Sequence, residues 1–308
     1  MKEEISVVNI LNENRMLKSL KRWSFLHRAF YRLFLSVAPS ILNNYFNFEY
    51  DGLENVDTTP EGTPVIFCAN HRSHLDSIIF GCALAKPNWK RRYMAFMASG
   101  KAMKENPFFG LLHYLGAFPV FPENPEPALK YALYSLHLGL ALYITPQGGR
   151  RARSTLGDYM NLHKEGRTGV GRLILKMNGI VPVIPVYIKG SAEALRVGQK
   201  VPKYKARVKI VFGKVMTFQQ YCKEKGWDED EEFYTITREI VNQIMCQIRG
   251  LLLSTEQYFL QFLEYSLGSS INFETLTDET IKRTEKIQRK LVGVPDSQLK
   301  RFLEAQKD

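Results

Sequence analysis

The feature that most constrains the fold of this chain is the alternation of short apolar segments with helical patterns between residues 65 and 212. Strands that alternate with helices form βαβ units, so this pattern predicts an α/β fold with a mixed, largely parallel sheet flanked by helices. The expected strands are Val65–Ala69, Tyr93–Met97, Ala117–Phe121, Ala141–Thr145, Val181–Ile188 and Val208–Phe212. The expected helices lie near Ser73–Leu84, Pro107–Leu115, Pro127–Leu138 and Gly169–Met177.

The segment Val181–Ile188 is continuously apolar apart from its prolines. A strand that is buried on both faces of the sheet has this pattern. Proline has no N–H to donate to a neighbouring strand, so Pro182 and Pro185 predict a position near an edge of the sheet or at a bulge.

Charge divides the chain at Trp227. The whole chain has 42 Lys and Arg against 31 Asp and Glu, a net charge of +11. The part up to Trp227 holds 32 basic and 16 acidic residues (+16), and the rest holds 10 basic and 15 acidic residues (−5). We therefore expect three units: an amphipathic helical membrane-interface segment at 1–45, an α/β domain at 46–227 and an acidic helical appendage at 228–308.

The composition is that of an ordinary globular protein, with 45% hydrophobic and 24% charged residues, which excludes collagen-like, disordered and disulfide-stapled classes. The four cysteines have no Cys-x-x-Cys spacing and the histidines no metal-ligand spacing, so we expect free thiols, no metal site and no resident cofactor. The basic first part suits nucleic acid or an anionic membrane surface. Because no nucleic-acid-binding module accompanies this charge, we expect a membrane surface with anionic lipid as the partner and no nucleic acid.

Residues Lys18–Val37 have the periodicity of an amphipathic helix, which we expect Pro39 to end. Such a helix lies in the interface of an anionic bilayer, or it packs on the domain with its basic face in solvent. No run has the roughly 18 apolar residues of a membrane span and no secretory signal is visible, so we expect a peripheral protein on the cytoplasmic face of a membrane. The apolar face carries Trp23, Leu26, Phe30, Leu33 and Val37, and the basic face carries Lys21, Arg28 and Arg32.

A histidine and an aspartate directly follow the first expected strand, in the segment Asn70-His71-Arg72-Ser73-His74-Leu75-Asp76. If the chain turns after His71 and Ser73 caps a new helix, Asp76 in the first turn points back at the imidazole. A carboxylate on one ring nitrogen leaves the other nitrogen free to take a proton, which makes a general base for an alcohol. Taken alone, this spacing is more often a capping-box-like helix start with a turn histidine.

A second polar segment, Pro146–Arg153, follows the strand at Ala141–Thr145. Two glycines expose backbone N–H groups, and three arginines within four residues offer bidentate donors to a phosphate or carboxylate. The alternative is a tight turn with a solvated basic patch. Both polar segments leave the carboxyl ends of strands, where open α/β sheets place their ligand crevice.

With these segments the chain resembles the glycerolipid acyltransferase family typified by 1-acylglycerol-3-phosphate acyltransferase. The order and spacing of four blocks agree over roughly residues 45–215. The blocks are Asn70-His71-x-Ser73-x-x-Asp76, Gly116-Ala117-Phe118-Pro119-Val120, Thr145-Pro146-Gln147-Gly148-Gly149-Arg150 and Val181-Pro182-Val183-Ile184-Pro185-Val186.

The resemblance implies a glycerolipid acyltransferase-like fold and the transfer of a fatty acyl group from acyl-CoA or acyl carrier protein to a hydroxyl of a lysophospholipid, most simply 1-acylglycerol-3-phosphate. His71 would be the general base, Asp76 would orient it, and no acyl-enzyme would form. Backbone N–H groups of the glycine-rich turn or of the histidine turn are candidate donors to the oxyanion. The substrate-binding residues implied are Asn70, Ser73, Gln147, Gly148, Gly149, Arg150, Arg151 and Arg153.

Three positions depart from the family pattern. Pro122 stands where members with a phosphate-bearing acceptor usually have an arginine, Gln147 replaces a glutamate, and Gly149 replaces a threonine. These changes leave His71 and Asp76 intact but put the acceptor in doubt. The alternatives are a glycerol-3-phosphate or other lyso-lipid acyltransferase, or a non-catalytic lipid-binding protein of the same fold.

One further histidine and one glycine-rich segment are expected to play no catalytic part. His74 is two residues from Asp76, a spacing that directs side chains apart on a helix, so we expect it at the rim of the site. The segment Gly166–Gly171 lacks the lysine of a P-loop and the spacing of a Rossmann loop, so we do not expect it to bind a nucleotide.

Overall fold

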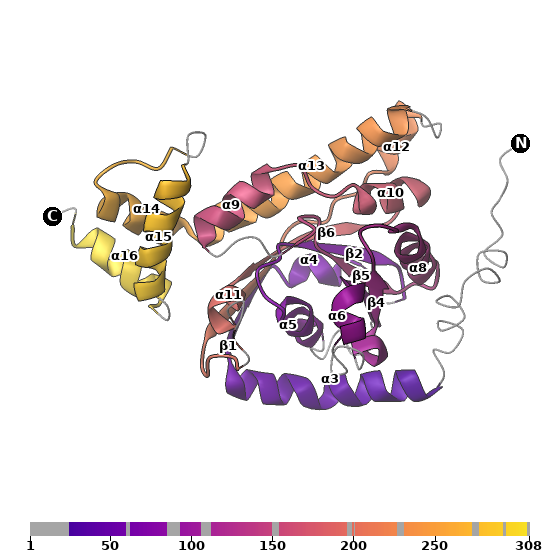
Figure 1. Cartoon of the computed structure of the whole chain (residues 1–308), viewed down its shortest axis with the longest axis horizontal. Coiled ribbons are helices and arrows are strands. Elements are labelled where there is room, and N and C mark those ends of the chain that lie inside the picture. The colour runs from indigo at the N-terminus through magenta and orange to yellow at the C-terminus, as the bar shows by residue number, and fades with distance from the viewer. Residues whose placement is uncertain are drawn as a thin grey trace, which may run out of the picture.

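The computed structural model describes residues 25–59, 62–84, 93–105, 112–149, 154–195, 199, 201–226, 231–272, 277–291 and 294–306. A seven-stranded sheet forms its centre, with strands in the order β1-β7-β6-β2-β5-β3-β4 (Figure 1). The strands are β1 (Asn47–Asp51), β2 (Val65–Ala69), β3 (Met94–Ser99), β4 (Ala117–Val120), β5 (Ala141–Ile144), β6 (Val183–Lys189) and β7 (Arg207–Phe212).

The sheet is mixed and largely parallel, as the alternation of strands and helices predicts. Strands β6, β2, β5, β3 and β4 are parallel to one another. Strand β7 pairs antiparallel with β6, and β1 pairs parallel with β7. Strands β1 and β7 therefore run antiparallel to the other five. Because β6, β2 and β5 are neighbours, the segments that follow their carboxyl ends meet at one edge of the sheet.

All six expected strands are present, with ends shifted by a few residues at most. The prediction of an edge position for the strand with two prolines is wrong, because β6 lies between β7 and β2. The alternative of a bulge is correct. The pairing of β6 with the chain after β7 shifts by one residue between Val186↔Phe212 and the bridge Val183↔Met216, and Pro185 lies at this shift.

Helices cover both faces of the sheet (Figure 1). One face carries α8 (Glu126–His137), α10 (Gly169–Lys176) and α13 (Glu231–Thr255), and the other carries α3 (Phe25–Tyr45) and α5 (Asp76–Ala83). The remaining short elements are α4 (Glu54–Asp57), α6 (Gly100–Glu105), the 3₁₀ turn η2 (Leu112–Leu115), α9 (Thr155–His163), α11 (Ser191–Ala194) and α12 (Gln219–Lys225). Residues 107–111 of the helix expected at Pro107–Leu115 lie outside the described residues.

Helix α3 continues through Pro39 to Tyr45, so the prediction that Pro39 ends the helix is wrong. Proline removes one helical hydrogen bond, but packing holds the helix on both sides of it. Tyr31 is buried before the proline, and Leu42 packs against the core cluster after it. Lys21 and Trp23, which belong to the expected amphipathic pattern, lie outside the described residues, as do the side chains of Leu26 and Arg28.

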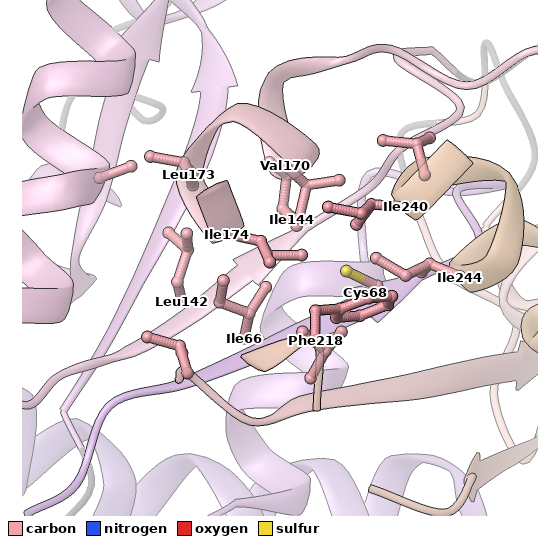
Figure 2. Packing of buried hydrophobic residues seen from close by; sticks show 14 of the residues in the cluster. Ile66, Cys68, Leu142, Ile144, Val170, Leu173, Ile174, Phe218, Ile240 and Ile244 are labelled. Carbon is pink, nitrogen blue, oxygen red and sulfur yellow. The ribbon is translucent and has the colours of Figure 1, made fainter. Parts of the chain in front are cut away.

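Helix α13 packs on the sheet and shares its core. Figure 2 shows Ile240 and Ile244 of this helix beside Ile174 of α10 and Cys68 of β2. The hydrophobic core therefore extends beyond Trp227, where the change of charge had suggested a boundary. The apolar stripe of α13 covers the sheet, so the change of charge at Trp227 does not mark the end of the core.

The last three helices are α14 (Gln257–Leu267), α15 (Asp278–Lys290) and α16 (Asp296–Glu304), which lie together at one end of the molecule (Figure 1). They enclose a small cluster of their own, which includes Phe259, Leu263 and Leu299 and reaches Leu156 of α9. Within the described segments, no helix combines the length and the apolar character needed to cross a bilayer.

Candidate active site

His71 and Asp76 form a hydrogen-bonded pair at the carboxyl end of β2. The Nδ1 atom of His71 lies 2.9 Å from Oδ2 of Asp76. Asp76 is almost completely buried, whereas the side chain of His71 is 26% exposed. When Nδ1 carries its proton toward the carboxylate, Nε2 keeps a lone pair and can accept a proton from a bound hydroxyl.

The turn between the two residues is closed by its own hydrogen bonds. Oδ2 of Asp76 also accepts the backbone N–H groups of Arg72 at 2.8 Å and Ser73 at 2.9 Å. The hydroxyl of Ser73 accepts the N–H of Leu75 and donates to the carbonyl of Leu195. Asp76 then opens α5, so its carboxylate reaches back over the turn. The hydroxyl of Ser73 therefore stabilises the turn through these two hydrogen bonds.

Gln147 joins the second polar segment to this turn. Its Oε1 accepts the backbone N–H of His71 at 2.6 Å, and its Nε2 donates to Oδ1 of Asp158 at 2.9 Å. The N–H groups of His71, Arg72 and Ser73 are thus all engaged. The expectation that the histidine turn supplies oxyanion donors is wrong for these three groups, because Asp76 and Gln147 already accept them.

Asp158 of α9 ties Gln147 to Asn70. Its Oδ2 accepts Nδ2 of Asn70 at 2.8 Å, and Oδ1 of Asn70 accepts the backbone N–H of Ile188 at 2.7 Å. Nδ2 of Asn70 also donates to the carbonyl of Ile188 at 3.1 Å, so Asn70 bridges α9 and the end of β6 and both N–H groups of its amide are engaged. Burial raises the pKa of Asp158, and the charge of Arg72 and the two amide donors oppose that rise only in part.

Arg72, which follows His71, points away from it into the protein. Its side chain is completely buried, and Nη2 donates to Oε1 of Glu193 at 3.0 Å. Burial alone would lower the pKa of Arg72, but the surrounding negative charges, Glu193 foremost, raise it above its usual value. The guanidinium is therefore a permanent charge beneath the turn.

Helix α15 contacts Glu193, the ion-pair partner of Arg72. Nε2 of Gln288 in α15 lies 2.8 Å from Oε1 of Glu193 and 3.1 Å from Oγ1 of Thr155, while Oε1 of Gln288 accepts the N–H of Thr155. At the end of β6, Lys189 forms ion pairs with Glu256 at 3.0 Å and with Asp296 of α16 at 2.9 Å. Polar contacts thus connect the turn that holds His71 and Asp76 to α15 and α16.

The glycine-rich turn after β5 lies beside an arginine that the sequence did not single out. Gly148 has φ of +70°, and a Cβ atom there would lie 2.6 Å from Cγ of Arg167. The N–H of Arg167 also donates to the carbonyl of Pro146 at 2.7 Å. Arg167 is exposed, and no ion pair joins it to another described residue. The site therefore has a cation beside Gly148.

Not every expected substrate-binding residue can be placed. Arg150, Arg151 and Arg153 lie outside the described residues. Gly149 is half-buried, and its N–H makes no backbone hydrogen bond to a described residue. His74 is exposed, in keeping with the expected place at the rim.

Sequence reasoning missed Asp158, Arg72 and Arg167. Asp158 lies in a helix start of ordinary composition, and only the neighbouring places of β2, β5 and β6 bring it to Asn70 and Gln147. Arg72 was inside the recognised motif, but nothing in the sequence distinguishes a buried arginine from an exposed one. For Arg167 a signal existed, since Gly166–Gly171 was weighed as a phosphate loop and set aside for its spacing.

A comparison with protein families finds a match over the part of the chain that holds this site. Residues 47–189 match the model of a family described as Acyltransferase. The matched range runs from β1 to the end of β6 and contains His71, Asp76 and Gln147. A comparison with curated protein sequences finds no match.

Nine chains of known structure match. One is the crystal structure of the 1-acyl-sn-glycerophosphate (LPA) acyltransferase PlsC from Thermotoga maritima. It is 18% identical to this chain, with a TM-score of 0.44, over 79% of this chain and 87% of that one. The family match confirms the resemblance seen in the four sequence blocks, and it covers the part of the chain that carries His71 and Asp76.

Proposed function

We propose that this protein transfers a fatty acyl group from a thioester, acyl-CoA or acyl carrier protein, to the hydroxyl of a lysophospholipid, with 1-acylglycerol-3-phosphate as the favoured acceptor. One observation carries the proposal. His71 and Asp76 lie 2.9 Å apart, with Asp76 buried and His71 partly exposed, inside a segment that matches the acyltransferase family.

In the proposed reaction, Nε2 of His71 takes the proton of the acceptor hydroxyl while the oxygen attacks the thioester carbonyl. Asp76 stabilises the imidazolium that forms, because its carboxylate accepts the Nδ1 proton. When the tetrahedral intermediate collapses, the carbon–sulfur bond breaks and the departing thiolate takes the proton from His71. The products are a new ester and a free thiol, and no acyl-enzyme or resident cofactor is needed.

The negative charge on the intermediate requires hydrogen-bond donors that are not already engaged. The N–H groups of His71, Arg72 and Ser73 are excluded by their bonds to Gln147 and Asp76. The N–H of Gly149 is the candidate that we favour, since it lies two residues after Gln147 and makes no backbone hydrogen bond to a described residue.

The acceptor's phosphate needs a cation near the site, and Pro122 leaves the family's usual arginine missing. Arg167 supports a replacement, because its side chain lies against Gly148 of the turn that holds His71. A guanidinium binds phosphate through paired N–H donors. Arg150, Arg151 and Arg153 belong to the same proposal on the sequence pattern alone.

The substrate is a membrane lipid, so we propose that the enzyme works as a peripheral protein on the cytoplasmic face of a membrane. Helix α3 supports this proposal. Phe30, Leu33, Val37 and Ile41 recur on one side of the helix and are each 45–62% exposed, although large apolar side chains usually face a core.

A panel of substrates tests the proposal. Purified protein would be given labelled acyl-CoA or acyl carrier protein with 1-acylglycerol-3-phosphate, glycerol-3-phosphate and neutral lyso-lipids in vesicles. Transfer to 1-acylglycerol-3-phosphate supports the favoured acceptor, and transfer to another acceptor alone changes the substrate but not the reaction. Vesicle binding without transfer to any acceptor would favour the non-catalytic lipid-binding alternative, which the departures at Pro122 and Gln147 motivate.

A further inference from the structure

Exposed apolar side chains gather around α3. Among the described residues, twelve large hydrophobic side chains are exposed, and seven of them lie on α3 or on segments that contact its two ends. These seven are Phe30, Leu33, Val37, Ile41, Tyr114, Val201 and Tyr204. Exposed hydrophobic side chains that are scattered singly over a protein need no explanation, whereas a cluster of them around one element indicates an interaction surface.

The two ends of α3 are extended by other parts of the chain. Near its start, the ring of Tyr114 in η2 makes an edge contact with Phe30, with ring centroids 5.9 Å apart. At its end, the loop Val201–Lys205 between β6 and β7 packs on Tyr45. The hydroxyl of Tyr45 donates to the carbonyl of Pro202, and the rings of Tyr45 and Tyr204 are 5.4 Å apart.

The loop Val201–Lys205 is itself amphipathic. Val201 is 72% exposed and Tyr204 is 63% exposed, more than any apolar side chain that the structure describes in α3. Lys203 and Lys205 alternate with them and are exposed, and Nζ of Lys205 lies 2.8 Å from the carbonyl of Asn44 in α3. A tyrosine between lysines suits the headgroup region of a bilayer, where the ring is partly buried and the ammonium groups meet lipid phosphates.

We propose that Val201–Lys205 is a second membrane-anchoring element, which binds an anionic phospholipid bilayer together with the apolar side of α3. The bilayer is favoured over a protein partner because positive charge accompanies the exposed apolar side chains, in a chain part with a net charge of +16 from 32 basic and 16 acidic residues. The proposal rests on the proposed function only in placing the acceptor lipid in a membrane. The binding itself can be measured without any acyl transfer.

Two groups of variants of the full chain, with matched controls, test the loop in sedimentation with vesicles. The charge variant is Lys203→Gln with Lys205→Gln, and its control is Lys223→Gln with Lys225→Gln, an exposed pair with the same spacing in α12. The apolar variant is Val201→Ser with Tyr204→Ser. Its control is Ile180→Ser with Tyr234→Ser, both about as exposed but on other elements.

The charge variant should bind vesicles with about 30% phosphatidylglycerol roughly 25-fold more weakly than the wild type, and the difference should shrink at high salt. The apolar variant should bind both neutral and anionic vesicles more weakly, with little dependence on salt. Both controls should bind like the wild type. Circular dichroism of each variant shows that the fold is kept.

Wild-type binding by both loop variants, or an equal loss in the controls, would overturn the proposal. A concentration-dependent dimer that the loop variants dissolve would overturn it too, since a second copy of the chain would then cover the surface. Failure of the proposed function gives a different result. In that case no acyl transfer occurs even with detergent-dispersed acceptor, while the loop variants still lose vesicle binding.

Discussion

Nδ1 of His71 lies 2.9 Å from Oδ2 of Asp76, and this oxygen also accepts the backbone N–H groups of the next two residues, Arg72 and Ser73. One buried carboxylate therefore shapes the turn and orients the imidazole. No hydrogen bond to a described residue engages Nε2 of His71, so this nitrogen is available for a substrate in the proposed reaction. This relationship gives the first prediction.

Asp76→Asn should lower kcat by about 10²–10⁴-fold with a smaller effect on KM, because an amide cannot stabilise the imidazolium as a carboxylate does. Steady-state kinetics at saturating acyl donor would measure this loss. His74→Ala, at an exposed histidine in the same segment, is the matched control and should keep wild-type kcat. Equal activity of Asp76→Asn and wild type would contradict the role of Asp76.

The raised pKa of Asp158 predicts how Asp158→Asn changes stability with pH. Between the ordinary aspartate pKa of about 4 and the raised value, the folded state keeps a proton that the unfolded chain has lost. The wild type therefore loses stability as the pH rises through this range, and the variant lacks this contribution. Loss of the bonds to Asn70 and Gln147 adds a pH-independent cost to the variant.

The free energy of unfolding of the wild type minus that of Asp158→Asn should therefore decrease as the pH rises above about 4. Urea denaturation of both proteins at several pH values between about 4.5 and 7.5 measures this difference. A difference that grows with pH would mean that the pKa of Asp158 is lowered by its donors and by Arg72.

Gln288→Leu tests the connection between α15 and the turn that holds His71 and Asp76. The change removes the bonds from Gln288 to Glu193 and Thr155, and Glu193 is the ion-pair partner of buried Arg72. We expect a loss of about 1–3 kcal/mol in the free energy of unfolding and a lower kcat. Gln298→Leu, at an exposed glutamine of α16, should change neither. An equal effect of the two substitutions would mean that the contacts of Gln288 in α15 do not influence the site.

Arg167→Gln tests the proposed phosphate contact. Because an arginine–phosphate contact contributes through charge and paired hydrogen bonds, KM for 1-acylglycerol-3-phosphate should rise about tenfold or more. KM for a neutral lyso-lipid should not change. Arg238→Gln, at another surface arginine, which pairs with Glu165, is the control. A uniform change for both acceptors would assign Arg167 to structure instead of headgroup recognition.

Much of the sheet could be predicted from the sequence because its strands are short apolar runs between helices. Strand β1 could not, since Asn47–Asp51 alternates polar and apolar residues at an edge and resembles an exposed loop. The central place of β6 was hidden by Pro185, whose missing N–H coincides with a shift in pairing. For β1 and β6, pairing with strands that are distant in the sequence decides the structure, and local propensity does not.

The pairing of His71 with Asp76 follows from the motif and a helix start, so local reasoning reaches it. The hydrogen bonds that support this pair from behind cannot be predicted by local reasoning. Asn70, Gln147 and Asp158 come from three segments that only the strand order β6-β2-β5 brings together. The contribution of α15 was equally unpredictable, because Gln288 lies on a charged helix with no motif and contacts the domain more than 130 residues away in sequence.

The most direct test of the whole account is the rate of acyl transfer to 1-acylglycerol-3-phosphate by the wild type and by His71→Ala, both purified and shown to be folded. The account predicts transfer by the wild type and a loss of at least about 10³-fold in the variant, because in the proposed reaction His71 takes the hydroxyl proton. Comparable rates for the two proteins would contradict it and would remove His71 from the reaction.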